Sequence, residues 1–254
     1  MIIKNEQELK FLRRSGQILG RTLALLKSRV KPGVSAYELD QLARAEIAAA
    51  GARPAFLNYR AQPGDVPFPA ALCVSLNDEI VHGIPVKEKI LRAGDIVSLD
   101  LGLEYQGLFT DAAITVPVGR VDAQSQQLIE AATQGLEDAI GIIAPGQRIG
   151  DIGAAIEAAA RQAGFEVVRD LVGHGVGRAV HEAPEIPCFG KAGTGAKLTE
   201  GLVIAVEPMV NAGTWRVMFD DDQWTIRTQD GGRSAHMEHT LLVTKQGCEV
   251  LTRP

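Results

Sequence analysis

The chain has few cysteines, and those it has are far apart. Cys73, Cys188 and Cys248 are each at least 60 residues from the next, so they form neither a disulfide framework nor a CxxC metal knuckle. No uncharged apolar run approaches the ~20 residues that span a bilayer. The first twenty residues are charged and lack the apolar core of a secretory signal. We therefore expect a cytoplasmic protein in a reducing compartment, with no membrane contact.

Basic residues are also fewer than acidic residues. The chain has 26 Lys and Arg against 31 Asp and Glu, a net charge of −5, which argues against a direct nucleic-acid partner. A composition of 46% hydrophobic and 22% charged residues is that of a folded globular protein. A length of 254 residues is close to the upper limit for one hydrophobic core. We expect a single domain over residues 1–254, and a monomer.

An internal duplication is the strongest pattern in the sequence. Segments 31–51 and 144–164 each begin with a Pro-Gly turn, continue as an alanine-rich amphipathic stretch and end on glycine, with matching residues 113 apart. Each copy predicts a helix with a glycine stop. A further amphipathic helix is predicted after Asn5, which has Glu8 three residues later, as in a capping box.

The duplication continues into predicted strands. Gly94–Asp100 and Gly201–Glu207 are apolar runs that each end in a carboxylate, 107 residues apart. A match this long favours an α/β (α+β) fold of two halves, roughly 1–120 and 121–254. We expect the halves to be βαβ-like or ααββ-like and related by a pseudo-twofold axis, with strands inside and helices outside.

Two acidic residues flank a predicted hairpin. A turn centred on Tyr105 and Gln106 would place Asp100 directly opposite Asp111, with both carboxylates on one face. Like charges facing each other are destabilising, and the neighbouring residues are apolar, so such a pair needs a cation or a proton. Taken alone, either residue is more often a surface turn residue.

The second half supplies matching carboxylates. Glu207 and Glu238 correspond to Asp100 and Asp111, with the spacing widened from 11 to 31 residues by an insertion over 215–232. A pseudo-twofold axis would bring all four acidic groups together. This convergence follows from the duplication, because an isolated Glu near a strand end is more often solvated.

Two histidines lie in a glycine-rich segment. His174 is flanked by glycines that permit close backbone approach, and His181 follows seven residues later. A lone histidine in such a turn is more often structural. The spacing is not that of a zinc helix, because Pro184 would stop the helix, and no dinucleotide-binding glycine pattern is completed.

Five motifs in fixed order together resemble the type I methionine aminopeptidases. They are Val81–Pro85, Asp100 with Asp111, Gly173–Arg178 followed by His181-Glu182, Glu207–Met209, and Glu238–Thr240. The resemblance covers nearly the whole chain and implies the pita-bread fold, without an N-terminal extension domain.

The resemblance implies two divalent metal ions in one centre. The implied ligands are Asp100, Asp111, His174, Glu207 and Glu238. Asp111 and Glu238 would bridge the ions, whose charge balances that of the four carboxylates. Oxygen-rich ligation with one imidazole suits Co, Mn or Fe, and leaves Zn or Ni open.

The resemblance also implies a reaction and its residues. A bridging hydroxide would attack the bond after an N-terminal methionine of nascent proteins and peptides, preferably before a small second residue. His181 would donate to the tetrahedral intermediate, His82 would contact the scissile nitrogen, and Glu207 would shuttle a proton. Ribosome association is left open.

A methionine pocket is implied as well. The family lines it at positions occupied here by Tyr59, Phe68, Cys73 and Trp224, and ordinary core packing is the plainer interpretation of these residues. Three positions depart from the family pattern. Asp65 and Val180 stand where aromatics are common, and His236 stands where an amide is common.

Two alternative functions share these motifs. Prolidases and X-Pro aminopeptidases use the same five ligands but generally carry an additional N-terminal domain, for which the sequence before Lys31 leaves little room. A pita-bread binding protein without catalysis is the other alternative. The complete ligand set with both histidines argues against it.

Overall fold

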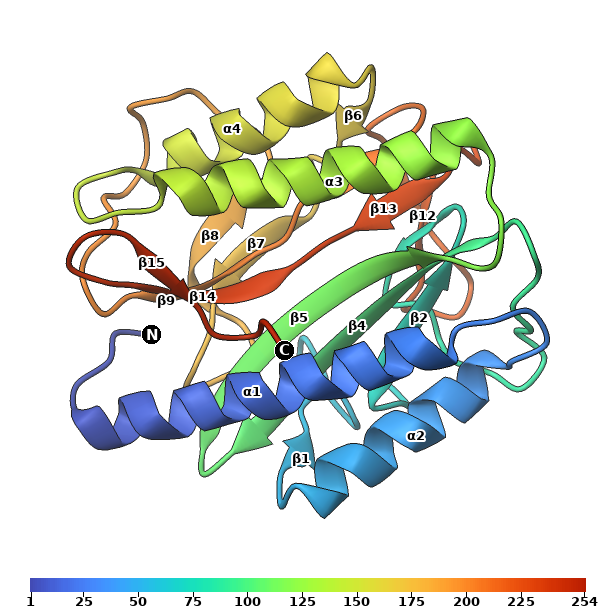
Figure 1. Ribbon diagram of the computed structural model, residues 1–254, viewed down its shortest axis with the longest axis horizontal. Helices are drawn as coiled ribbons and strands as arrows, with labels where there is room; N and C mark the ends of the chain where they lie inside the picture. The colour runs from blue at the N-terminus through green and yellow to red at the C-terminus, as the bar shows by residue number, and fades with distance from the viewer.

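Four helices cover one side of the strands in the computed structural model, which describes residues 1–254 (Figure 1). The helices are α1 (Glu6–Arg29), α2 (Ala36–Ala49), α3 (Ala123–Ile142) and α4 (Ile149–Gln162). None of them combines the length and apolarity that crossing a bilayer requires.

The strands alternate with the helices in two runs. The first run comprises β1 (Arg53–Pro54), β2 (Leu72–Leu76), β3 (Glu79–Val81), β4 (Ile96–Tyr105) and β5 (Leu108–Pro117). The second run comprises β6 (Glu166–Val167), β7 (Val172–Gly175), β8 (Glu182–Pro187), β9 (Val203–Val206), β10 (Met209–Asn211), β11 (Val217–Phe219), β12 (Ile226–Thr228), β13 (Ser234–His236), β14 (His239–Val243) and β15 (Cys248–Val250).

The predicted helices begin and end at the capping residues and glycine stops that the sequence indicates. Asn5 accepts a hydrogen bond from the Glu8 backbone N–H and begins α1. Helices α2 and α4 follow the two Pro-Gly turns, and each ends before a glycine with positive φ, at Gly51 and Gly164. Helix α3 ends 113 residues after α1, so the duplication extends to the first helix of each half.

The two halves meet between β5 and β14. One half pairs β2, β4 and β5, and the other pairs β7, β9 and β14. Across the boundary Glu238 N donates to Ala113 O at 2.8 Å and Asp111 N donates to Thr240 Oγ1 at 2.9 Å. The predicted two-half pita-bread fold is therefore confirmed, and its central seam lies beside two of the predicted ligands.

The turn of the first hairpin lies one residue later than predicted, so the predicted strand register is wrong by two residues. The turn is Gln106-Gly107, where both residues have positive φ, as a two-residue type I′ hairpin requires. Asp100 consequently pairs with Ala113, and Asp111 pairs with Gly102. The two carboxylates are diagonal neighbours rather than directly opposite. They still leave the same face, because side chains alternate with a period of two.

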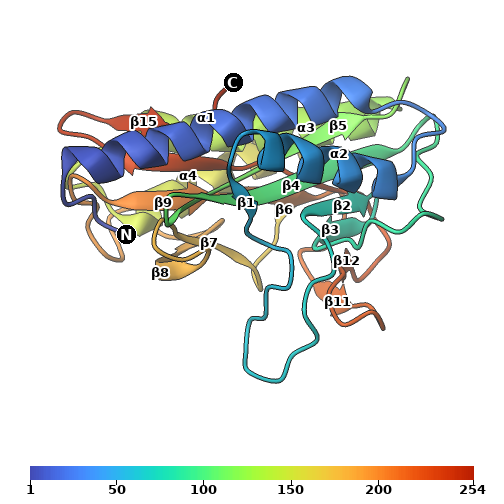
Figure 2. The same cartoon turned by 90° about the horizontal axis from the view of Figure 1, so that it is seen from below.

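The predicted insertion between Glu207 and Glu238 is a small hairpin. Strands β11 and β12 pair with each other, and β12 also pairs with β3. Trp224, in its turn, donates from Nε1 to Val66 O at 3.1 Å. The hairpin is thereby tied to the proline-rich loop 62–69, and both project from the strands on the side away from the helices (Figure 2).

The packing of α1 depends on a small residue. A Cβ at Gly16 would lie 2.2 Å from Leu251 O, so Gly16→Ala must push α1 away from the C-terminal segment. We expect a loss of about 1–3 kcal/mol in unfolding free energy, measured by denaturant titration. The control is Gly141→Ala in α3, where a Cβ meets nothing within 4 Å, which should stabilise by up to ~1 kcal/mol. Equal unfolding curves for the two variants would contradict this packing.

Candidate metal and catalytic site

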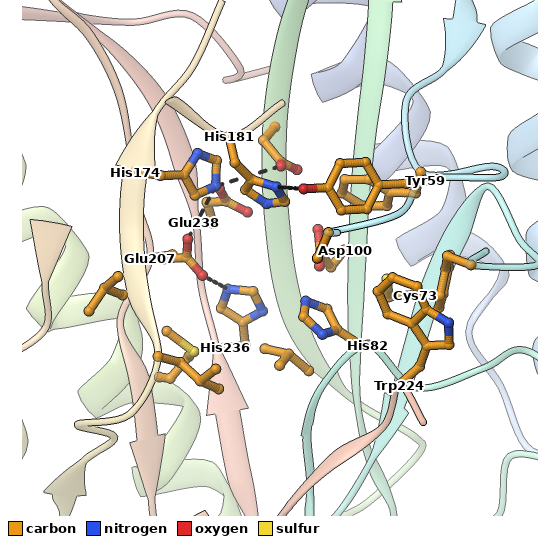
Figure 3. A pocket seen from close by; sticks show the side chains of 18 of the residues that line it. Tyr59, Cys73, His82, Asp100, His174, His181, Glu207, Trp224, His236 and Glu238 are labelled. Atoms are coloured by element: carbon orange, nitrogen blue, oxygen red, sulfur yellow. Dashed lines mark hydrogen bonds and ion pairs between the residues drawn. The ribbon is translucent and has the colours of Figure 1, made fainter. Parts of the chain in front are cut away.

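A cavity of about 760 Å³ gathers all the residues predicted for the site. Those residues are Tyr59, Phe68, Cys73, His82, Asp100, Asp111, His174, His181, Glu207, Trp224 and Glu238. They come from both halves of the chain. Figure 3 shows His174, Glu207 and Glu238 on one side of the cavity, Tyr59 and Trp224 on the other, and Asp100 between the two groups.

The four carboxylates lie at the seam between the halves. Asp100 and Asp111 lie within β4 and β5, while Glu207 follows β9 and Glu238 precedes β14. Asp100, Asp111 and Glu238 are between 2% and 7% exposed. One oxygen of each of these three has no hydrogen-bond partner. Buried acidic oxygens left unpaired indicate a site built for a cation.

Burial and mutual repulsion strongly raise the pKa values of these four carboxyl groups. Burial is the main reason that the pKa values of Asp111 and Glu207 rise to about 8, and Asp111 is raised further by Glu207. Burial, then the charges of neighbouring carboxylates, raises the pKa values of Asp100 and Glu238 well above their usual range. The fold therefore holds four acids that need protons or cations.

Three sets of side chains place their ligand atoms within 4.8 Å of one another. The sets are Asp100, Asp111 and Glu238; His174, Glu207 and Glu238; and Asp111, His174 and His181. Glu238 and Asp111 each belong to two sets. Mixed carboxylate and imidazole donors of this kind suit Mn, Fe or Co, so the residues present fit divalent metal ions.

His174 is oriented toward the carboxylates. Its Nδ1 lies 3.0 Å from Gly175 O, which only accepts, so Nδ1 carries the proton. The lone pair of Nε2 then points to Glu207 Oε1 at 3.4 Å and Asp111 Oδ2 at 3.9 Å. Burial lowers the pKa of His174 to about 3, so the ring is neutral. A backbone carbonyl that fixes the free nitrogen in this way is typical of a metal-binding histidine.

His82 occupies a strained backbone position. Its φ is 58°, in the left-handed region that residues other than glycine rarely adopt. The following residue is confined, because a Cβ at Gly83 would lie 2.4 Å from Val74 O. Burial, then the nearby His181 and His236, lowers the pKa of His82 to about 4. Strain retained at a neutral, cavity-lining histidine is typical of a functional position.

His181 is held from two sides. Its Nδ1 lies 2.7 Å from the Tyr59 hydroxyl. The turn that carries it is fixed by Glu182, which accepts from Ala179 N at 2.9 Å and lies 3.3 Å from the Met1 amino nitrogen. The ring is thereby placed at the cavity while its Nε2 remains free of protein partners.

The apolar wall of the cavity consists mainly of aromatic rings. Phe68 and Trp224 meet edge to face at 5.3 Å, and Tyr59 lies 6.5 Å from Trp224. Val180 packs into the same cluster. Asp65 lies outside the cavity, where its carboxylate accepts from Gln62 N at 2.7 Å. Neither of these two unusual residues lines the cavity, but Val180 packs against the residues of its apolar wall.

Several lining residues carry no signal in the sequence. Phe56 and Met209 line the cavity but, read as sequence, look like ordinary core residues. Met209 belongs to the Glu207–Met209 motif, which offers the only hint of its position. His236, unusual in the sequence, is 2% exposed and lines the cavity beside Glu207.

Comparison with known proteins agrees with this geometry. The model of metallopeptidase family M24 matches residues 10–245. A methionine aminopeptidase of Aquifex aeolicus is 44% identical over 252 residues, covering 98% of this chain and 97% of that protein. Methionine aminopeptidase B of Synechocystis is 45% identical, covering 99% and 92%.

Solved structures show the same similarity. The methionine aminopeptidase of Thermotoga maritima superimposes with a TM-score of 0.94 at 42% identity, covering both chains completely. The prolidase of Pyrococcus furiosus gives a TM-score of 0.76 at 21% identity, covering all of this chain and 66% of the other. The second similarity shows a shared fold alone.

Proposed function

The chain belongs to metallopeptidase family M24, and we propose that it removes the N-terminal methionine from nascent proteins and peptides, preferring a small second residue. The observation that carries the proposal is the convergence of four carboxylates, three of them buried, and His174 beside an aromatic cavity. The relatives that match over nearly their whole length are named methionine aminopeptidases, which supports this substrate.

Two metal ions would be held by the residues of both halves. Asp100 would complete one site, His174 and Glu207 the other, and Asp111 with Glu238 would belong to both. Glu238 belongs to two of the close ligand sets, which supports this assignment of ligands to the two sites. When bound, divalent ions at these residues would supply water activation and Lewis-acid polarisation of a carbonyl.

The histidines would handle the substrate. The Tyr59 hydroxyl lies 2.7 Å from His181 Nδ1, and donation from this hydroxyl would place the ring proton on Nε2. That N–H would donate to the oxygen that gains charge during attack. His82, neutral because its pKa is about 4, would hydrogen-bond at the scissile nitrogen, and Glu207 would carry a proton to the leaving amine.

The aromatic wall would select the side chain. Phe68, Trp224 and Tyr59, with the buried Cys73 beside them, offer ring edges and soft contacts that suit a thioether. A flexible methionine side chain fills such a cavity without a polar partner.

Replacing His82 by Ala should lower kcat by about 10²-fold, because a positioned hydrogen-bonding group is lost. Metal content should stay near that of the parent protein, since His82 belongs to none of the close ligand sets. Steady-state kinetics and metal analysis of the same sample check both parts. An unchanged kcat would remove His82 from the reaction.

A peptide assay tests the function. Met-Ala-Ser with Mn²⁺ or Co²⁺ should release methionine, while an X-Pro peptide should remain intact. Rapid X-Pro cleavage without methionine release would favour the prolidase alternative, and no turnover of either peptide with full metal content would favour a binding protein. Nascent chains as substrates imply a cytoplasmic location. Ribosome association would be tested by cosedimentation.

A further inference from the structure

His236 is a buried histidine whose backbone is held by hydrogen bonds to a neighbouring strand. It ends β13 and is 2% exposed. The hydroxyl of Thr115 hydrogen-bonds to both polar groups of its backbone. Thr115 Oγ1 accepts from His236 N and donates to His236 O, both at 2.8 Å. Ser98 Oγ lies 2.7 Å from the same hydroxyl. These bonds fix the backbone of His236, and so the point from which its side chain extends, at the seam between the halves.

The ring of His236 faces Glu207. Its Nε2 lies 3.3 Å from Glu207 Oε2, although neither ring nitrogen makes a well-aligned hydrogen bond with any group, Glu207 included. On the other side, His174 Nε2 lies 3.4 Å from Glu207 Oε1. Each oxygen of one carboxylate thus faces a different imidazole, as Figure 3 shows.

Two simpler roles for His236 do not match this geometry. As a metal ligand it would share a close set with the carboxylates, but it belongs to none of the three. As a purely structural core histidine it would have hydrogen-bond partners for its ring nitrogens, because buried polar atoms without partners destabilise the fold. Its only close polar neighbour is Glu207.

We propose that His236 is a positioning residue that donates from Nε2 to Glu207 Oε2 and so directs Oε1 toward His174 and the metal site. An ionised carboxylate only accepts, which places the ring proton on Nε2. A fixed partner of this kind orients a metal ligand and tunes its basicity. The proposal rests on the proposed function, in which Glu207 is both a ligand and a proton carrier.

Three substitutions test the geometry of this donor. His236→Gln places an amide N–H at about the reach of Nε2, His236→Asn reaches only as far as Nδ1, and His236→Leu removes the donor. We expect His236→Leu and His236→Asn to weaken Mn²⁺ affinity and lower kcat by about 10–100-fold. His236→Gln should stay within a few-fold of the parent protein.

The measurements separate positioning from a loss of packing. Mn²⁺ affinity is measured by competition with a chromogenic chelator, kcat and KM with a Met-Ala-Ser peptide, and folding by melting of the metal-free protein. The matched control is His239→Gln, whose imidazole contacts Thr252 Oγ1 at 2.8 Å and lies outside the cavity. It should leave Mn²⁺ affinity unchanged.

Each outcome bears on one claim. Parent-like affinity and kcat in a folded His236→Leu variant would overturn the positioning role. A His236→Gln variant as impaired as His236→Leu would overturn it too. If no variant or parent cleaves the peptide while Mn²⁺ affinity follows the expected order, the proposed function fails and the positioning of Glu207 stands.

Discussion

Replacing Asp111 by Asn is expected to lower methionine release on the order of a thousandfold or more, because it removes the ligand on which activation of water depends. Asp111 belongs to two of the three close ligand sets, so in the proposed centre its loss would affect both metal positions. The same change removes an acid whose pKa is raised to about 8 by burial and by Glu207. The metal-free variant should therefore melt higher than the metal-free parent above pH 7.

A second buried aspartate provides the control. Asp40 is 2% exposed and accepts hydrogen bonds from the backbone of Ala71 and Leu72 at 2.7 and 3.1 Å. Asp40→Asn should lower stability without changing metal affinity. Kinetics, metal titration and melting curves on both variants check these opposite patterns. An Asp111→Asn variant with full metal content and full activity would refute the ligand assignment.

Removing the metal ions should cost more stability at high pH than at low pH. The folded-state pKa values of Asp111 and Glu207, about 8, exceed the unfolded values near 4. The metal-free folded state therefore binds more protons than the unfolded state between about pH 4 and pH 8. Its stability is greatest below that window and falls as pH rises through it.

Melting curves with chelator or with excess Mn²⁺, recorded from pH 5 to pH 8, measure this effect. A thousandfold excess of ligand over Kd stabilises by about 4 kcal/mol, which is roughly 10 °C for a chain of this size. The difference in melting temperature between the protein with chelator and the protein with excess Mn²⁺ should be larger at pH 8 than at pH 5. Identical melting temperatures with and without chelator would contradict a buried acidic site.

Much of the candidate site could be predicted because the chemistry repeats along the chain. The duplication alone pairs Asp100 with Glu207 and Asp111 with Glu238, and the structure brings all four into one cavity. Pro-Gly turns and glycine stops bounded α2 and α4 to within a few residues, since these residues have strong backbone preferences.

The remaining features depend on tertiary contacts. The register of the β4–β5 hairpin was wrong because positive φ at Gln106 and Gly107, rather than symmetry about the tip, places the turn. The position of Phe56 in the cavity wall follows from packing across distant segments. The contact of His236 with Glu207 likewise joins residues from separate strands, and local sequence carries no information about such pairs.

The central claim is that acidic groups from both halves of the chain hold a pair of ions between them. Anomalous diffraction from crystals grown with Mn²⁺ tests it most directly. Two peaks per chain should appear, both within coordination distance of Asp111 and Glu238. A single site elsewhere, or no peak near these two carboxylates at saturating Mn²⁺, would contradict the account.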